Sequence, residues 1–125
     1  MKIYVASFYD AKERIKPIVD RLRGFGHVVV STWTEEPHTG DNDKTLTNGL
    51  RLYYAWRDLK EVDAADLLLL DTLDVNPRGG REFEAGYAYG TGKLVWLVGP
   101  ERSIFHRYLQ VRFETCHEVF RVLGQ

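Results

Sequence analysis

Short apolar stretches alternate with longer amphipathic stretches along the whole chain. The apolar stretches at residues 2–7, 27–32, 66–71 and 94–98 have the length and the apolar, partly β-branched content of strands. Between them, residues 10–23, 45–64 and 81–90 have the spacing of helices. Beyond the fourth strand the pattern predicts a short helix at 103–108, a short edge strand at 111–113 and a terminal helix at 115–123.

The first helix has the clearest start and end signals. Its apolar side chains, Ile15, Ile18, Val19 and Leu22, recur at helical spacing. Asp10 is the predicted N-cap, because Glu13 follows three residues later as in a capping box, and the glycines of residues 24–26 end the helix. Residues 34–43, by contrast, are polar, lack periodicity and predict a loop.

Strands that alternate with helices through short connections predict βαβ units, a mainly parallel sheet and helices on both faces. Five strands in 125 residues favour a single-domain α/β fold of the flavodoxin-like, Rossmann-like kind. We expect a three-layer sandwich over residues 1–125, with a five-stranded sheet in the order 2-1-3-4-5. No repeat, linker or low-complexity tract divides the sequence.

Composition narrows the possible partners. The chain is 44% hydrophobic and 28% charged, and its 17 basic and 18 acidic residues leave a net charge of −1. We therefore expect no attraction to a nucleic acid polymer or to an anionic membrane. No apolar stretch approaches the roughly 20 residues that span a bilayer. The single cysteine, Cys116, excludes an internal disulfide and a cysteine-based metal site, and it fits a reducing cytoplasm.

Several familiar chemical signatures are absent. The sequence Gly-Thr-Gly-Lys at 90–93 lacks the spacing of a phosphate loop and precedes a strand, so it is interpreted as the end of a helix. The first strand is not followed by the glycines of a dinucleotide fingerprint, and no nucleophile elbow is present. The four histidines show no metal-ligand spacing, and we expect neither a metal nor an organic cofactor.

Chemistry-bearing side chains gather where the strands end. In an open α/β sheet, ligands bind at the carboxyl ends of the strands. Aromatic rings, acids and arginines together suit a nucleoside or nucleotide, with stacking for the base, acids for the sugar and positive charge for a phosphate. The residues that the predicted fold brings to this edge are Tyr4, Ser7, Phe8, Tyr9, Trp33, Arg78, Gly79, Gly80, Arg81, Glu84 and the turn 100–106.

Two carboxylates stand out. Glu84 is predicted near the start of a helix, where the macrodipole favours an ionised carboxylate that suits a nucleophile. The alternative is that Glu82 and Glu84 are ordinary helix-starting glutamates. Asp58 lies in a helix among the apolar neighbours Trp56, Leu59 and Val62, although an aspartate in a helix is more often solvent-facing.

Four stretches of the chain resemble one known family. They are Lys-Ile-Tyr-Val-Ala-Ser at 2–7, Arg-Asp-Leu at 57–59 with Ala-Asp at 65–66, Gly-x-x-x-Glu-x-Gly-Tyr-Ala at 80–88, and Gly-Lys at 92–93. In this order they resemble the nucleoside 2-deoxyribosyltransferase superfamily, which includes the 2'-deoxynucleoside 5'-phosphate N-hydrolases. The resemblance covers most of the chain.

The resemblance implies a role for each matching residue. Glu84 matches the nucleophile that forms a covalent glycosyl-enzyme intermediate, and Asp58 matches the aspartate that holds the sugar and helps to protonate the leaving base. Tyr4 matches a tyrosine whose hydroxyl lies beside the nucleophile. Ser7 falls in a loop that contacts the nucleotide. Glu82, the rival nucleophile, is expected to point elsewhere on its helix.

One departure bears on the substrate. The transferases carry an acidic residue where this chain has Arg78, near Arg81, and an arginine favours a 5'-phosphate. This difference, together with the short chain, favours hydrolysis of a nucleoside 5'-monophosphate; solvated loop charges are the alternative for both arginines. Base exchange by a deoxyribosyltransferase and a non-catalytic nucleotide-binding module stay open. The sequence also leaves open which base is removed, whether the sugar is ribose or 2'-deoxyribose, and whether water or a second base is the acceptor.

The family also implies an assembly. Its active sites are completed by a neighbouring subunit from the turn after the fourth strand. We therefore expect a homodimer or larger homo-oligomer in which Arg102, Ser103 and His106 reach across the interface.

Overall fold

The computed structural model describes residues 1–36, 46–76 and 78–125, and these form one α/β unit. Its sheet has five strands: β1 (Lys2–Ala6), β2 (Val28–Val29), β3 (Leu67–Asp71), β4 (Leu94–Val98) and β5 (Val111–Phe113). All neighbouring strands are parallel, and their order is β2-β1-β3-β4-β5. The predicted fold class and strand order are confirmed, and the edge strand β5 is parallel like the rest.

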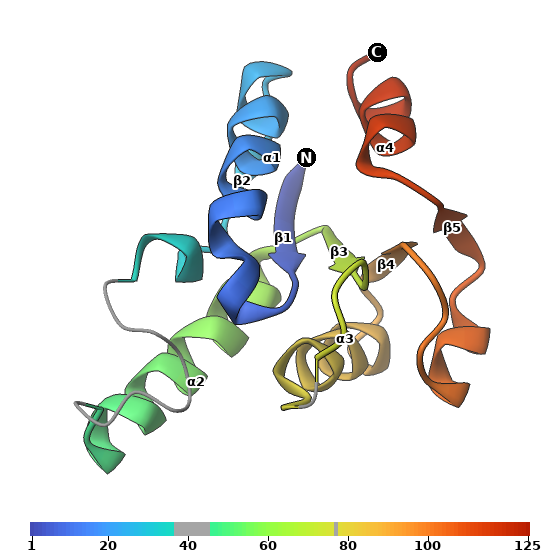
Figure 1. Cartoon of the computed structure of the whole chain (residues 1–125). Helices are drawn as coiled ribbons and strands as arrows, with labels where there is room; N and C mark the ends of the chain where they lie inside the picture. Colours follow the sequence, from blue (N-terminus) through green and yellow to red (C-terminus); the bar gives the residue numbers. More distant parts are fainter. Residues whose placement is uncertain (37–45, 77) are drawn as a thin grey trace.

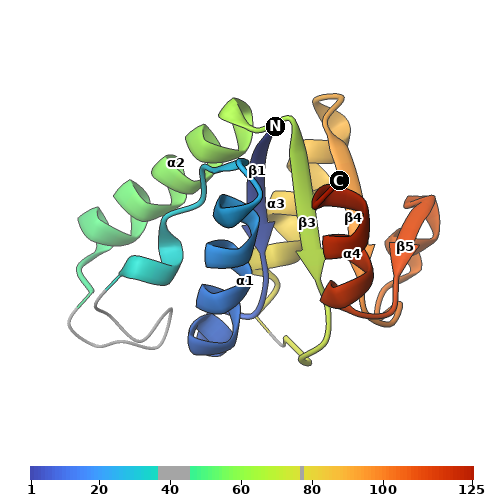
Figure 2. The ribbon, with the colours of Figure 1, turned by 90° about the horizontal axis from the view of Figure 1, so that it is seen from above.

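Helices cover both faces of the sheet. Helices α1 (Lys12–Gly24) and α4 (Cys116–Leu123) lie together on one face, while α2 (Asn48–Ala64) and α3 (Gly80–Gly90) lie together on the other (Figures 1 and 2). Three short 3-10 helices, η1 (Tyr9–Ala11), η2 (Trp33–Glu35) and η3 (Ile104–Tyr108), follow β1, β2 and β4. The three-layer arrangement is therefore as predicted.

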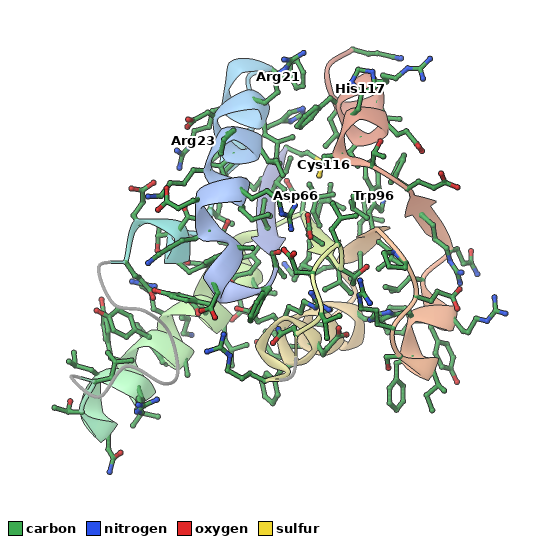
Figure 3. All side chains as sticks on the ribbon, viewed as in Figure 1. Arg21, Arg23, Asp66, Trp96, Cys116 and His117 are labelled. Atoms are coloured by element: carbon green, nitrogen blue, oxygen red, sulfur yellow. The ribbon has the colours of Figure 1, made fainter. Side chains whose placement is uncertain are left out.

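The core lies between these layers and is built around β3. All five residues of β3 are buried, as expected for a central parallel strand with helices on both faces. The sulfur of Cys116 lies under α4, toward the sheet, whereas Arg21 and His117 lie at the outer side of the α1/α4 layer (Figure 3). In the described part of the chain, no helix is both long and apolar enough to cross a membrane.

The second strand is shorter than its apolar pattern predicts. The prediction covered 27–32, but β2 comprises Val28 and Val29 alone. Beyond Val29, the backbone groups of Val5 on β1 bond to side chains. The Val5 N–H donates to Ser31 Oγ at 3.1 Å, and the Val5 carbonyl accepts from Trp33 Nε1 at 2.7 Å. Side chains thus replace the strand ladder here, and the chain turns into η2.

The start of the first helix also differs from the prediction. Asp10 is not an N-cap: it lies within η1, the N-cap of α1 is Ala11, and that cap has no side-chain hydrogen bond. The Asp10 carboxylate instead pairs with Arg78 at 2.7 Å. A partner from the distant β3–α3 loop, which a local pattern does not reveal, therefore decides the role of this residue.

The other helix boundaries agree within a few residues. The side chain of Thr47 caps α2 by accepting the Leu50 N–H at 3.1 Å, and the predicted start at residue 45 lies outside the described residues. Ser103 and Thr115 cap η3 and α4 in the same way. Of the predicted loop at 34–43, residues 37–43 also lie outside the described residues.

Candidate active site

A cavity of about 420 Å³ opens beyond the carboxyl ends of β1 and β3, between α2 and α3. This is the switch point of the sheet, because the chain runs from β1 to β2 on one side while β3 lies on the other. The predicted residues that line the cavity are Ser7, Tyr9, Trp33, Asp58, Arg78, Gly80, Arg81 and Glu84. We call it the switch-point pocket.

Tyr4 and Glu84 meet at the base of this pocket. Tyr4 is fully buried in β1, and its hydroxyl donates a short hydrogen bond to Glu84 Oε2. Burial, followed by the charges of Glu84 and Asp58, raises the pKa of Tyr4 well above its ordinary value. The phenol therefore stays protonated and acts as a hydrogen-bond donor to the carboxylate.

Both carboxyl groups of the pocket hold their protons more tightly than usual. Burial and, next, the charge of Asp58 raise the pKa of Glu84 to about 8, while the hydrogen bond from Tyr4 acts in the opposite direction. Burial likewise raises the pKa of Asp58 to about 6, with Arg57 opposing and Glu61 adding to the rise. At a pH between these two pKa values, Glu84 and Asp58 together carry about one proton, which the two carboxyl groups share.

This result corrects the expected ionisation of Glu84. The helix α3 begins at Gly80, so Glu82 lies in its first turn and Glu84 in its second. The helix macrodipole acts mainly within the first turn. Loss of hydration and the neighbouring Asp58 therefore outweigh it, and Glu84 has the more strongly raised pKa of the two carboxyl groups.

Arg78 forms one side of the pocket. Its guanidinium pairs with Asp10 at 2.7 Å and lies over the ring of Phe8, 5.1 Å from the centroid. Phe8 therefore packs against Arg78 and is not among the pocket-lining residues. On the same wall, the hydroxyl of Ser7 donates to Asp71 Oδ1 at 3.3 Å.

Arg81 is buried and bonded inside the protein, unlike a solvated loop charge. Its Nη1 donates to the backbone carbonyls of Asp71 at 3.3 Å and Asp74 at 2.6 Å, and its Nε donates to Glu82 at 3.2 Å. These bonds tie the β3–α3 loop to α3. Just before the helix, Gly79 has a φ of 78°, a conformation that favours glycine.

An aromatic and acidic wall closes the pocket on the side of η2. The rings of Tyr9 and Trp33 lie 5.7 Å apart, and the Tyr9 hydroxyl donates to Glu36 Oε2 at 2.9 Å. The buried Glu36 also pairs with Arg57 of α2. The sequence gives no signal for Glu36 as a site residue, because it lies in a segment without periodicity and its partners are distant in the sequence.

The α2 side of the pocket contains further residues that sequence reasoning missed, notably Arg51 and Tyr54. The one available signal was their spacing from Asp58: Tyr54 lies four residues before it and Arg51 seven, which places all three on one helical face. Among the described residues, no group of acidic, histidine and cysteine side chains is arranged to hold a metal ion.

His106 is not brought to the switch-point pocket of its own chain. It is buried beside a second cavity of about 350 Å³ between α3 and η3. Its Nε2 lies 2.7 Å from Glu82 Oε2, and its Nδ1 accepts the Arg102 N–H at 3.0 Å. Both ring nitrogens are thus engaged within one subunit, so His106 does not reach outward as expected. Glu82 points away from Glu84, as predicted.

The fold and the pocket together define a doubly wound α/β protein with a half-buried two-carboxylate site at its switch point. No protein-family model matches the sequence, and no curated protein matches it either. Among solved structures, the chain is similar to a 2-deoxyribosyltransferase from Bacillus psychrosaccharolyticus, with 26% identity over 98% of this chain and 96% of that one, and a TM-score of 0.74.

A second solved structure shares the fold. The CMP N-glycosidase of Clostridium botulinum is 18% identical, the match covers 98% of each chain, and the TM-score is 0.66. Both similarities extend over nearly the entire length of this chain and of its neighbours. They support the predicted α/β architecture.

Proposed function

We propose that this protein cleaves the N-glycosidic bond of a (deoxy)nucleoside 5'-monophosphate through a covalent intermediate on Glu84. The observation that carries the proposal is the contact of Tyr4 with Glu84 near Asp58, at a pocket of nucleotide-compatible size that both carboxyl groups line. An enzyme that acts on N-glycosidic bonds is the general class, and the two structural neighbours, a deoxyribosyltransferase and an N-glycosidase, support it.

The two carboxyl groups divide the chemistry. In the reactive form Glu84 is ionised and Asp58 holds the shared proton. The Glu84 carboxylate attacks the anomeric carbon as the bond to the base nitrogen breaks, and Asp58 delivers its proton to the departing base. Water then attacks the glycosyl ester, Asp58 takes a proton from that water, and Glu84 is released. Two displacements retain the anomeric configuration.

The Tyr4 hydroxyl supports this cycle. Its hydrogen bond stabilises the Glu84 carboxylate against the burial that favours protonation. Because the pKa of Tyr4 is itself raised, the phenol does not compete for the shared proton as a base. Tyr4 is thus the donor that keeps part of the Glu84 population ionised before the sugar arrives.

Arg78 supports a phosphate-bearing substrate. It lines the pocket near Gly80, the first residue of α3, where backbone N–H groups also favour an anion. A guanidinium binds a phosphate through two parallel hydrogen bonds. Asp10 pairs with Arg78 now, so a 5'-phosphate has to compete with that carboxylate. The rings of Trp33 and Tyr9 line the same pocket and suit the base.

We also propose a homo-oligomer whose subunits share the pocket region. Large apolar side chains are exposed along α3 and η3: Phe83 (69%), Ile104 (80%), Phe105 (69%) and Tyr108 (66%). Phe83 is both part of the pocket wall and highly exposed, so a partner that covers it also closes the site. Arg102 and Ser103, like His106, bond within their own chain and are not assigned to the partner's site.

A chromatographic assay tests the function. The protein is incubated with ribo- and deoxynucleosides and their 5'-monophosphates, with and without a second free base. We expect release of free base from monophosphates without added acceptor. An Arg78→Ala variant should lose about tenfold or more in kcat/KM on monophosphates and little on nucleosides.

The same assay separates the alternatives. A new nucleoside that forms only with an acceptor base would identify a deoxyribosyltransferase. Nucleotides that raise the melting temperature but are never converted would identify a binding module and overturn both enzymatic proposals. A Glu84→Ala variant provides the background rate in every arm.

A further inference from the structure

Arg57 lies at the centre of a cluster of acidic side chains next to the proposed acid. Its Nη2 forms a short contact with Glu36 Oε1 and lies 3.3 Å from Asp58 Oδ1, and its Nε is 4.0 Å from Glu61 Oε2. The guanidinium also lies over the ring of Tyr54, 4.9 Å from the centroid. One cation is therefore shared among three carboxylates.

The two carboxylates that flank this cation are themselves held in place. Glu36 accepts the Tyr9 hydroxyl at 2.9 Å, and its backbone carbonyl accepts from Lys12 at 2.7 Å. Glu61 accepts from the backbone N–H of Thr32 at 3.1 Å and from its hydroxyl at 2.6 Å. The side chains of Glu36 and Glu61 are only 5% and 15% exposed, so water screens these charges little.

We propose that the Glu36–Arg57 ion pair positions the Arg57 guanidinium beside Asp58 and thereby sets the orientation and proton affinity of that carboxyl group. Arg57 and Glu36 are positioning residues in this proposal, which rests on the proposed function of Asp58 as the acid. Glu36 shares the cation with Asp58, so only part of the effect of the guanidinium reaches Asp58. Asp58 then keeps enough proton affinity to serve as an acid in a pocket that also needs an ionised Glu84.

Several charged and titratable groups face this part of the pocket. Arg57 and Glu61 belong to the same helix as Asp58. Glu84 comes from α3, Tyr4 from β1 and Glu36 from the end of η2. Three further arginines line the same cavity: Arg51, Arg78 and Arg81. Among these, Arg57 lowers the pKa of Asp58 while burial and Glu61 raise it.

The two members of the ion pair therefore have opposite effects. Without Arg57, Asp58 loses its nearby cation and its pKa rises. With a neutral residue 36, Arg57 is released toward Asp58 and the pKa of Asp58 falls. If Arg57 is absent, neutralising residue 36 has nothing to release, so its effect should largely disappear. That non-additivity distinguishes positioning from two independent changes of charge.

The test is a pH titration of Asp58 by NMR on protein labelled with ¹³C at the aspartate carboxyl carbons, assigned with Asp58→Asn. This readout needs no substrate. The variants are Arg57→Gln, Arg57→Lys, Glu36→Gln and the double variant Arg57→Gln/Glu36→Gln. Matched controls are Glu35→Gln and Lys60→Gln, which change the same charges at exposed neighbouring positions. Thermal melts confirm that each variant is folded.

We expect the pKa of Asp58 to rise in Arg57→Gln, to fall in Glu36→Gln, and to return close to the wild-type value in Arg57→Lys. The acid limb of kcat/KM should move in the same directions, because kcat/KM reports the free enzyme. Loss of Arg57 should also lower kcat about tenfold through misplacement of Asp58. The two control variants should match the wild type in both measurements.

An unchanged pKa of Asp58 in folded Arg57→Gln, or shifts of the same sign in the two single variants, would overturn the proposal. Opposite shifts in a protein that converts no nucleoside or nucleotide would instead support the positioning role and overturn the proposed function. The two failures are thus separate. A control variant that shifts Asp58 as much as Glu36→Gln would also overturn the inference, since any nearby charge would then suffice.

Discussion

Two glutamates on α3, only two residues apart, lie in opposite electrostatic surroundings. Glu84 faces the switch-point pocket, where it accepts a hydrogen bond from Tyr4 and lies near the anionic side chain of Asp58. Glu82 faces the second cavity, where it lies between the Arg81 guanidinium at 3.2 Å and the ring of His106 at 2.7 Å. The same residue type thus meets an acid on one side of the helix and basic groups on the other.

The difference separates the proposed nucleophile from a glutamate held in a network of contacts. Burial beside another acid raises the pKa of Glu84 to about 8. Basic neighbours instead satisfy both Glu82 oxygens and join α3 to η3. A carboxyl group with a strongly shifted pKa is typical of catalytic sites, whereas a carboxylate with both oxygens hydrogen-bonded to basic groups is typical of structural networks.

The largest effect should come from neutralising Glu84. Glu84→Gln keeps the shape of the side chain but removes the nucleophile, so kcat/KM should fall about 10³-fold or more. The measurement is base release by chromatography, with substrate at several concentrations to separate kcat from KM. Comparable losses in Glu82→Gln and Glu84→Gln would remove the distinction between the two sites.

The pH dependence of stability should also distinguish the two glutamates. The pKa of Glu84 is raised from 4.5 to about 8 in the folded protein, so its contribution to stability is present below about pH 4.5 and is lost as the pH rises through 8. Asp58 acts in the same direction between 3.8 and about 6.

When the pH is raised from 5 to 8.5, we therefore expect the free energy of unfolding of Glu84→Gln to increase by on the order of 2 kcal/mol relative to that of the wild type. Urea unfolding at the two pH values measures this difference, and Glu82→Gln provides the comparison. A gain of Glu84→Gln that is the same at both pH values would show that Glu84 is not protonated more readily in the folded state.

Tyr4→Phe should have an intermediate effect. The variant loses the hydrogen bond that opposes protonation of Glu84, so the pKa of Glu84 should rise. At neutral pH, kcat/KM should fall about tenfold, with the alkaline limb of the profile displaced upward. Tyr87→Phe is the matched control, because that hydroxyl donates to Asp63 at 2.6 Å outside the pocket. Equal profiles for Tyr4→Phe and wild type would contradict the role of Tyr4.

The smallest effect should come from Glu82→Gln. This change weakens the contacts with Arg81 and His106, and stability should fall by about 1 kcal/mol. The activity should stay within about twofold of the wild type, since Glu82 lines the second cavity and not the switch-point pocket, and Arg81 keeps its bonds to the carbonyls of Asp71 and Asp74. Urea unfolding and the base-release assay measure the two quantities. A loss of activity without a loss of stability would place Glu82 in the chemistry instead.

Much of the architecture was predictable because the relevant signals are local. The run of leucines in β3, the helical spacing in α1 and the strand–helix alternation led to the correct class and strand order. The glycine that ends α1 and the boundary at β4 also agree with the prediction. These features depend on neighbours within a turn or on simple alternation, and a sequence displays both.

The surroundings of the site residues were less predictable. The ion-pair partners of Asp10 and Glu36 come from other elements, so a local pattern misassigned Asp10 and offered no signal for Glu36. The expected ionisation of Glu84 failed for the same reason. Helix position suggested a low pKa, whereas burial beside Asp58 raises it.

By itself, the sequence determined which residue types end each strand and which helices carry the two carboxylates, because periodicity and chain order specify a doubly wound sheet. Only the tertiary structure decided that Arg57 is shared between Glu36 and Asp58 and that Glu82 faces His106. Electrostatic environment depends on distance and burial in three dimensions, and neither quantity can be read along a chain.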